Sequence, residues 1–199
     1  MKSKNSETRN KLLLVAENNF ASKGYGIVNL HDIAVETGIA KSTLFHYFKT
    51  KQDLFQAIIR KIFFELKQLL RDEQKFIQPT KQDQIRSFFR EFLRWLKANP
   101  DRAKIIVRVQ LDYPDQSRKL AKKFWGPVIH YISCIVKTIR KDNHLDIEMF
   151  VLEMLNSMIN FVYSFNSHLF LVDQSNIDDL FQRFEKHIIF SVDQLLLEN

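Results

Sequence analysis

Apolar residues recur at intervals of three and four along almost the whole chain, which is the spacing of one face of an α-helix. Neither a sustained two-residue alternation, typical of a half-buried strand, nor an internal repeat interrupts this pattern. With only 4 Gly and 4 Pro in 199 residues, few positions favour the turns that sheets require. The sequence therefore predicts an all-α protein.

About nine helices account for the pattern, and residues that begin or end helices separate several of them. Gly24 and Gly38 lie where helix C-termini are expected, while Asn29 and Thr50 are N-cap residues with an Asp three positions later. Gly126-Pro127 predicts a kink or a break in the seventh helix. The expected ranges are roughly 7–22, 30–38, 40–47, 51–73, 81–98, 101–112, 115–141, 146–172 and 176–197.

Residues 29–51 contain two short helices separated by a turn at Gly38, which is the layout of a helix-turn-helix. Their apolar residues are expected to pack against Leu13, Ala16 and Phe20 of the first helix; they are Leu30, Ile33, Ala34, Ile39, Leu44 and Phe48. The outward positions of the second short helix are then Lys41, Ser42, Thr43, His46 and Tyr47. Hydroxyls, a cation and amphipathic rings are side chains that reach phosphates and base edges in a major groove.

Further positions in register extend this pattern from residue 12 to residue 54. They are Leu12-Leu13, Val15-Ala16, Phe20, Gly24-Tyr25, Asp32-Ile33-Ala34, Gly38-Ile39, Lys41, Thr43-Leu44, Tyr47-Phe48-Lys49-Thr50-Lys51 and Leu54. Together they resemble the N-terminal domain of TetR-family transcriptional regulators. The sequence departs from that family at Asn19, usually apolar, at Ala40, often Ser, at Ser42, commonly Gly, and at Phe45, often Tyr.

The resemblance implies a helix-turn-helix DNA-binding domain over residues 1–51 and a larger helical domain over 52–199 that binds a small molecule and dimerises. It implies that Asn29 and Lys51 hold DNA phosphates, while Lys41, Ser42, Thr43 and His46 face the groove with Tyr47 nearby. His31 is expected at the surface, and Phe45 either in the core or at the DNA. The expected function is a ligand-responsive repressor that binds a pseudo-palindromic operator in double-stranded DNA as a homodimer.

Apolar faces of the helices after residue 80 predict two further sites. The last two helices, 146–172 and 176–197, carry wide apolar stripes that predict the homodimer interface, unless they only fill the core of one subunit. Polar and aromatic groups embedded in apolar faces are expected to orient an effector in a pocket: Trp95, Arg108, Trp125, His130, Tyr131, Asn156, Asn160 and Tyr163.

The 18 Phe and 4 Met favour a hydrophobic effector, and the 15 basic against 6 acidic residues of 79–145 favour an anionic one. Both possibilities stay open.

Charge is divided unequally along the chain. Residues 1–145 hold 28 basic and 14 acidic residues, whereas residues 146–199 hold 2 basic and 9 acidic residues. A basic N-terminal part suits a polyanionic partner, and an acidic C-terminal part suits a region turned away from it.

Other classes of protein find little support in the sequence. The single cysteine, Cys134, excludes an internal disulfide, and its spacing from His130 makes a poor metal site, so no metal or cofactor is expected. The sequence has neither a His-Glu-x-x-His motif nor a Gly-rich phosphate-binding loop, which argues against an enzyme. No signal peptide or membrane span is expected, and the cytoplasm is the expected compartment. An effector-independent, nucleoid-associated DNA-binding protein remains an alternative, and an enzyme in the C-terminal helices a weaker one.

Overall fold

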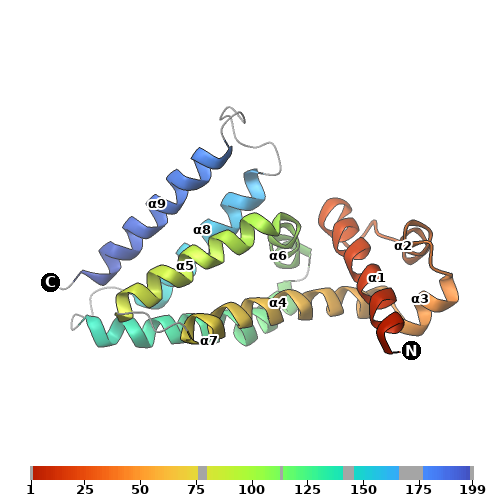
Figure 1. Cartoon of the computed structure of the whole chain (residues 1–199), viewed down its shortest axis with the longest axis horizontal. Helices are drawn as coiled ribbons and strands as arrows, with labels where there is room; N and C mark the ends of the chain where they lie inside the picture. The colour runs from red at the N-terminus through yellow and green to blue at the C-terminus, as the bar shows by residue number, and fades with distance from the viewer. Residues whose placement is uncertain (1, 76–79, 113, 141–145, 166–176, 198–199) are drawn as a thin grey trace.

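The computed structural model describes residues 2–75, 80–112, 114–140, 146–165 and 177–197, and within these ranges it contains nine α-helices and no strand. The predicted all-α fold is therefore confirmed. The helices are α1 (Lys2–Lys23), α2 (Leu30–Thr37), α3 (Lys41–Tyr47), α4 (Lys51–Lys75), α5 (Lys81–Ala98), α6 (Pro100–Asp112), α7 (Pro114–Ile139), α8 (Ile147–Phe165) and α9 (Ile177–Leu196). Figure 1 shows α1–α3 at one end of the molecule, α5–α9 at the other, and α4 running from the first group into the second.

The unit formed by α1–α3 packs as the sequence predicts. Its expected apolar residues are buried or packed against the core. The side-chain oxygen of Asn29 accepts a hydrogen bond from the His31 N–H at 2.9 Å and caps α2. Gly38 ends α2 with a φ of 66°, a left-handed conformation that favours glycine. The helix-turn-helix geometry is thus set by local sequence signals together with a small apolar core.

The start of α4 is fixed by a reciprocal pair of capping hydrogen bonds. The Thr50 N–H donates to Asp53 Oδ2, and the Asp53 N–H donates to Thr50 Oγ1, each at 3.0 Å. Beyond this cap, α4 buries Leu54, Phe55 and Ile58, and the Phe55 ring lies 4.9 Å from that of Phe20 in α1. The first turns of α4 therefore complete the core of the α1–α3 unit.

Helix α7 runs without interruption through Pro127, so the predicted possibility of a break there is wrong. Proline removes one backbone hydrogen bond. Burial of Val128, Ile132 and Val136 on the core side of the same helix offsets that loss. Helix α8 is described to Phe165, and the predicted extension over 166–172 lies outside the described residues. None of the described helices is long and apolar enough to cross a bilayer.

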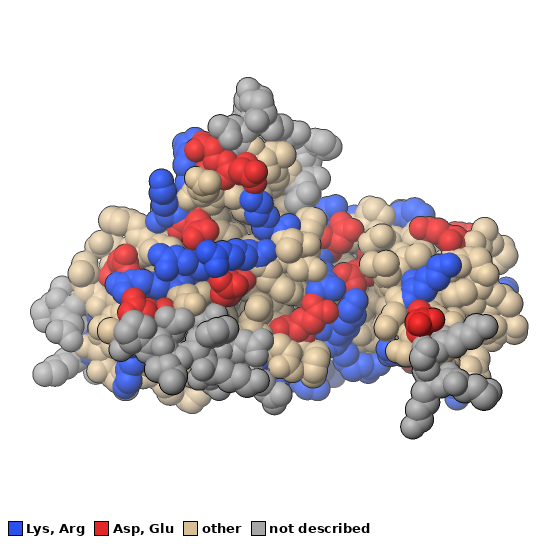
Figure 2. Space-filling model, viewed as in Figure 1, with Lys and Arg blue, Asp and Glu red and all other residues tan. Residues whose placement is uncertain are grey.

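Basic side chains of α5 meet acidic side chains of α9, as the adjacent blue and red surfaces in Figure 2 show. The ion pairs are Arg86–Asp193 at 2.7 Å, Lys97–Asp178 at 2.6 Å and Arg90–Glu185 at 3.5 Å. The hydrogen bond from Asp193 raises the pKa of Arg86 above its usual value. Part of the acidic C-terminal region therefore neutralises a neighbouring helix, which the division of charge along the chain did not predict.

Candidate nucleic-acid interface

Helix α3 presents one polar face to solvent because two apolar residues hold its other face. Leu44 is fully buried, and Phe48, which follows the helix, is 3% exposed. On the opposite side Lys41, Ser42 and His46 are exposed, and Thr43 and Tyr47 are half-buried. The structure thus brings all five predicted outward residues onto one short helix at the surface.

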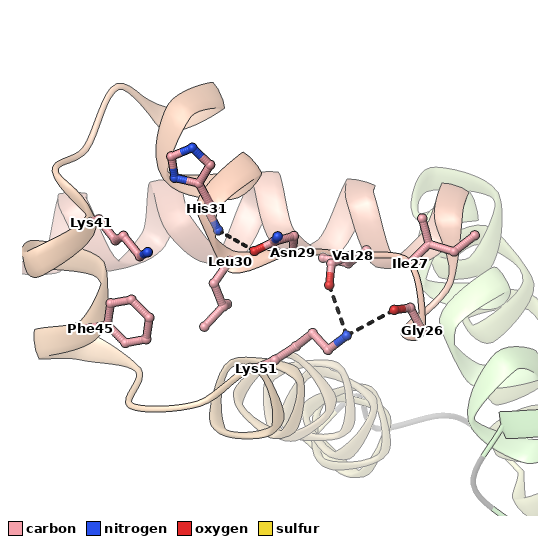
Figure 3. Close-up of a pocket in the computed structure, with 9 residues that line it drawn as sticks. All are labelled: Gly26, Ile27, Val28, Asn29, Leu30, His31, Lys41, Phe45 and Lys51. Atoms are coloured by element: carbon pink, nitrogen blue, oxygen red, sulfur yellow. Dashed lines mark hydrogen bonds between the residues drawn. The ribbon is translucent and has the colours of Figure 1, made fainter.

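A hollow of about 420 Å³ lies beside α3, between the start of α2 and the start of α4. It is lined by residues 26–31 together with Lys41, Phe45 and Lys51 (Figure 3). Phe45 is 39% exposed, and the Lys41 ammonium lies 5.9 Å from the centroid of its ring. Phe45 therefore lies at the surface, and the alternative that it belongs to the core is wrong. His31 is exposed, as expected.

The ammonium of Lys51, a predicted phosphate contact, is bonded within the protein. It donates hydrogen bonds to the carbonyl oxygens of Tyr25 at 2.8 Å, Gly26 at 3.2 Å and Val28 at 3.0 Å. Its nitrogen also lies 4.5 Å from the centroid of the Tyr25 ring. A lysine ammonium has three N–H donors, and all three are used here.

Asn29 and Tyr47 also make contacts within the protein. The carbonyl oxygen of the Asn29 side chain caps α2, which leaves its amide nitrogen as the remaining donor group. The Tyr47 hydroxyl donates to the backbone carbonyl of Asn5 in α1 at 3.2 Å and contacts the side-chain oxygen of the same residue. Tyr47 therefore connects α3 to the beginning of α1.

An ionic network that no sequence pattern predicted joins α1 to α4 and α6. Arg102 of α6 donates to Glu17 of α1 at 2.7 Å and also contacts Glu65 of α4. Lys61 of α4 lies 3.6 Å from the second oxygen of Glu17. The Glu17 and Arg102 side chains are only 7% and 11% exposed. No spacing along the chain relates positions 17, 65 and 102, so only the tertiary structure reveals this network.

Arg108, predicted to orient an effector, lies instead at the end of α1. Its guanidinium donates to the carbonyl oxygens of Ala21 at 3.1 Å and Ser22 at 3.2 Å. Gly24, at the end of α1, has a φ of +81°, a left-handed conformation that favours glycine, and a Cβ there would lie 2.7 Å from Arg108 Nη1. Arg108 therefore joins α6 to the end of α1.

The other predicted effector residues fall into two groups. Trp95 and Trp125 are half-buried and both contact Phe92, with ring centroids 6.4 Å and 5.9 Å from it. Tyr131, Asn156 and Tyr163 are half-buried on α7 and α8, whereas His130 and Asn160 are exposed. His130 Nε2 lies 3.5 Å from Cys134 Sγ, and Asn160 donates to the Asn156 carbonyl at 2.9 Å. The structure thus joins the two tryptophans in one aromatic cluster and leaves two of the polar residues at the surface.

Comparison with known proteins gives a family match over the N-terminal helices. The family described as bacterial regulatory proteins, tetR family, matches residues 12–58. A curated relative is the HTH-type transcriptional repressor BepR of Brucella suis biovar 1 (strain 1330), which is 31% identical over 78 residues. This match covers 39% of the chain and 37% of the repressor. The match with the repressor therefore spans little more than a third of its length.

Solved structures resemble the chain over nearly its whole length. A TetR-family transcriptional regulator from Streptomyces coelicolor gives a TM-score of 0.77 at 16% identity, covering 96% of this chain and 95% of that one. The fatty acid degradation regulator FadR from Bacillus halodurans gives a TM-score of 0.68 at 13% identity, covering 92% and 94%. These identities are low, so the structures support the fold rather than a shared ligand.

Proposed function

The chain belongs to the TetR family of DNA-binding transcriptional regulators through its residues 12–58, and on this premise we propose that it is a homodimeric repressor released from its operator by a small molecule. TetR-family regulators are transcription factors rather than enzymes, in agreement with the absence of a catalytic motif from the sequence. A regulator that binds the bacterial chromosome acts in the cytoplasm, which is where we place it.

The observation that carries the proposal is the exposed polar face of α3. Lys41, Ser42, Thr43 and His46 lie on one face of a helix that its apolar residues fix in the domain. We assign these side chains to the major groove, and Asn29 and Tyr47 to the flanking phosphates. The DNA-binding domain extends over residues 1–51 and is completed by the first turns of α4.

Selection of binding sites from random DNA tests this assignment. A dimer with two copies of α3 is expected to recover a pseudo-palindrome whose half-sites are separated by about 34–36 Å, or one turn of DNA. Thr43→Ala and His46→Ala are expected to change the recovered motif, while Lys137→Ala, on exposed α7 surface, leaves it unchanged. Recovery of one unchanged motif by all three variants would show that α3 does not face the bases.

The effector site belongs to residues 52–199, and the aromatic cluster around Phe92 supports a hydrophobic effector. In this cluster Phe92 contacts Trp95 of α5 and Trp125 of α7, and Trp125 also contacts Phe63 of α4. Half-buried Tyr131, Asn156 and Tyr163 supply polar groups on neighbouring helices. The dimer is expected to have two conformations, one in which the spacing of its DNA-binding domains fits the operator and one in which it does not. An effector that binds the second conformation more tightly shifts the equilibrium toward it and so releases the operator.

A long-chain fatty acid is the first probe, because one solved neighbour is named as a regulator of fatty acid degradation. Operator binding is followed by fluorescence anisotropy as palmitate is added. Release of the wild-type protein, but not of Trp125→Ala, supports a hydrophobic effector in this region. Retention of DNA with fatty acids and with a wider metabolite set would favour the effector-independent DNA-binding protein.

A further inference from the structure

Lys51 is the first residue of α4, and its side chain extends back over the segment that joins α1 to α2 (Figure 3). The three carbonyl groups that accept its hydrogen bonds belong to residues within a four-residue stretch, 25–28. Bonding of the same ammonium to three carbonyl groups fixes the course of this stretch. The lysine therefore acts as a cross-link between the start of α4 and the segment before α2.

The aromatic ring beneath the ammonium connects this cross-link to the core. Tyr25 stacks on Phe20 of α1 with centroids 5.7 Å apart, and its ring lies 5.1 Å from that of Phe55 in α4. The ammonium lies over the face of Tyr25, where the ring quadrupole attracts a cation. Both the cation and the carbonyl groups around it are thus held against a packed aromatic cluster.

The segment held by Lys51 ends at Asn29, the N-cap of α2. Its conformation therefore fixes where α2 begins relative to α4, and both helix ends border the hollow beside α3. We propose that Lys51 is a positioning residue that sets the start of α2 for DNA binding, and that it is not itself a phosphate contact. This inference rests on the proposed DNA-binding function of residues 1–51.

Lysine footprinting of the DNA-free protein tests the arrangement without using the proposed function. The wild-type protein is treated with formaldehyde and cyanoborohydride, and methylation of each lysine is followed by mass spectrometry. Exposed Lys41 and Lys49 are expected to be fully dimethylated while Lys51 remains largely unmodified. Reaction of Lys51 at the rate of Lys49 would overturn the proposal.

The same footprint in the operator complex separates positioning from phosphate contact. Lys41 is expected to lose reactivity on binding, whereas Lys51 is already protected before DNA is added. If Lys51 reacted in the free protein and became protected only in the complex, it would be a phosphate contact after all. A failure to recover any operator would instead contradict the proposed function and leave the DNA-free footprint as the test of Lys51.

The salt dependence of operator binding provides a second measurement. A lysine that neutralises one phosphate contributes about 0.9 to the slope of log K against log salt, so a phosphate contact at position 51 would make Lys51→Met reduce the slope by that amount. Lys51→Met is expected to weaken binding and leave the slope at the wild-type value, and Lys137→Met to change neither. A slope reduced by about 0.9 in Lys51→Met would contradict the positioning role. If circular dichroism shows Lys51→Met to be unfolded, the footprint decides.

Discussion

The structure explains why Asn19, which departs from the family pattern, is accommodated in α1. It occupies a position in α1 that is 5% exposed and usually apolar. Its amide nitrogen donates to the Val15 carbonyl at 2.9 Å and to the Glu36 carboxylate of α2 at 2.8 Å, and its oxygen accepts from Lys23 at 2.6 Å. A buried polar group is satisfied in this way, and α1 is joined to α2 by a specific contact.

Removal of this amide is expected to destabilise the protein. Asn19→Ala eliminates a partly buried hydrogen bond to a charged partner, a loss of about 1.5–3 kcal/mol in the free energy of unfolding. Urea denaturation followed by circular dichroism measures the difference. Asn18→Ala, at the exposed neighbouring position, is the matched control, with an expected change within about 0.5 kcal/mol. Equal stability of the two variants would show that the Asn19–Glu36 contact contributes nothing.

Phe45 supports a second prediction at the residue scale. It is 39% exposed beside the hollow, at a position where the family often has Tyr. Phe45→Tyr adds a hydroxyl that can donate to a DNA phosphate, and a net gain of about 0.5–1.5 kcal/mol in binding is expected. The slope of log K against log salt should not change, because the new donor carries no charge. Anisotropy titrations at several salt concentrations measure both quantities, and unchanged affinity would place residue 45 away from the phosphates.

Individual helices were largely predictable from the sequence because their signals are local. Apolar spacing placed α5 at Lys81–Ala98, and Thr50 with Asp53 identified the start of α4. Contacts between helices distant in the chain were not predictable. The bonds of Arg108 to the end of α1 and of Lys51 to backbone carbonyls are examples that no spacing in the sequence indicated. The type of side chain was informative, but its partner depends on packing that periodicity does not describe.

The network between α1 and α6 gives a prediction at the scale of helices. Arg102→Met would leave the Glu17 carboxylate buried without its arginine partner. Within the described part of the chain, the cation then nearest to it is Lys61, at 3.6 Å. Breaking a buried ion pair from one side costs about 3–5 kcal/mol. Chemical denaturation of Arg102→Met, Glu17→Gln and the double variant measures the coupling between the two residues. The double variant is expected to lose much less than the sum of the single changes, and simple additivity would contradict a direct interaction.

Across the whole molecule, ion pairing limits where a polyanion can bind. Arg86, Arg90 and Lys97 of α5 are paired with acidic residues of α9, so their charge is partly neutralised within the protein. Lys41 and Lys49, by contrast, are exposed next to the polar face of α3. The acidic α9 therefore reduces the competition of α5 for DNA and favours binding at the opposite end of the molecule.

The proposed dimer is the remaining feature that belongs to the whole molecule. Phe190 of α9 is 61% exposed and lines a surface hollow of about 450 Å³ together with Ile189 and Arg90. A large apolar side chain on the surface of α9 is consistent with contact to a second copy through the last two helices. Phe190→Glu places a charge there and is expected to yield monomers in sedimentation velocity experiments. Phe64 of α4 is also 61% exposed, so Phe64→Glu is the matched control and should remain dimeric.

The consequence for DNA binding follows from the symmetry of the dimer. Two DNA-binding domains on one operator release about twice as many counterions as one domain on a half-site, so monomeric Phe190→Glu should show about half the wild-type salt slope. Its sequence preference within a half-site should be unchanged, because α3 is untouched. A monomer that retained the full slope would mean that one domain makes all the phosphate contacts, while a dimeric Phe190→Glu would place the interface elsewhere than at this surface of α9.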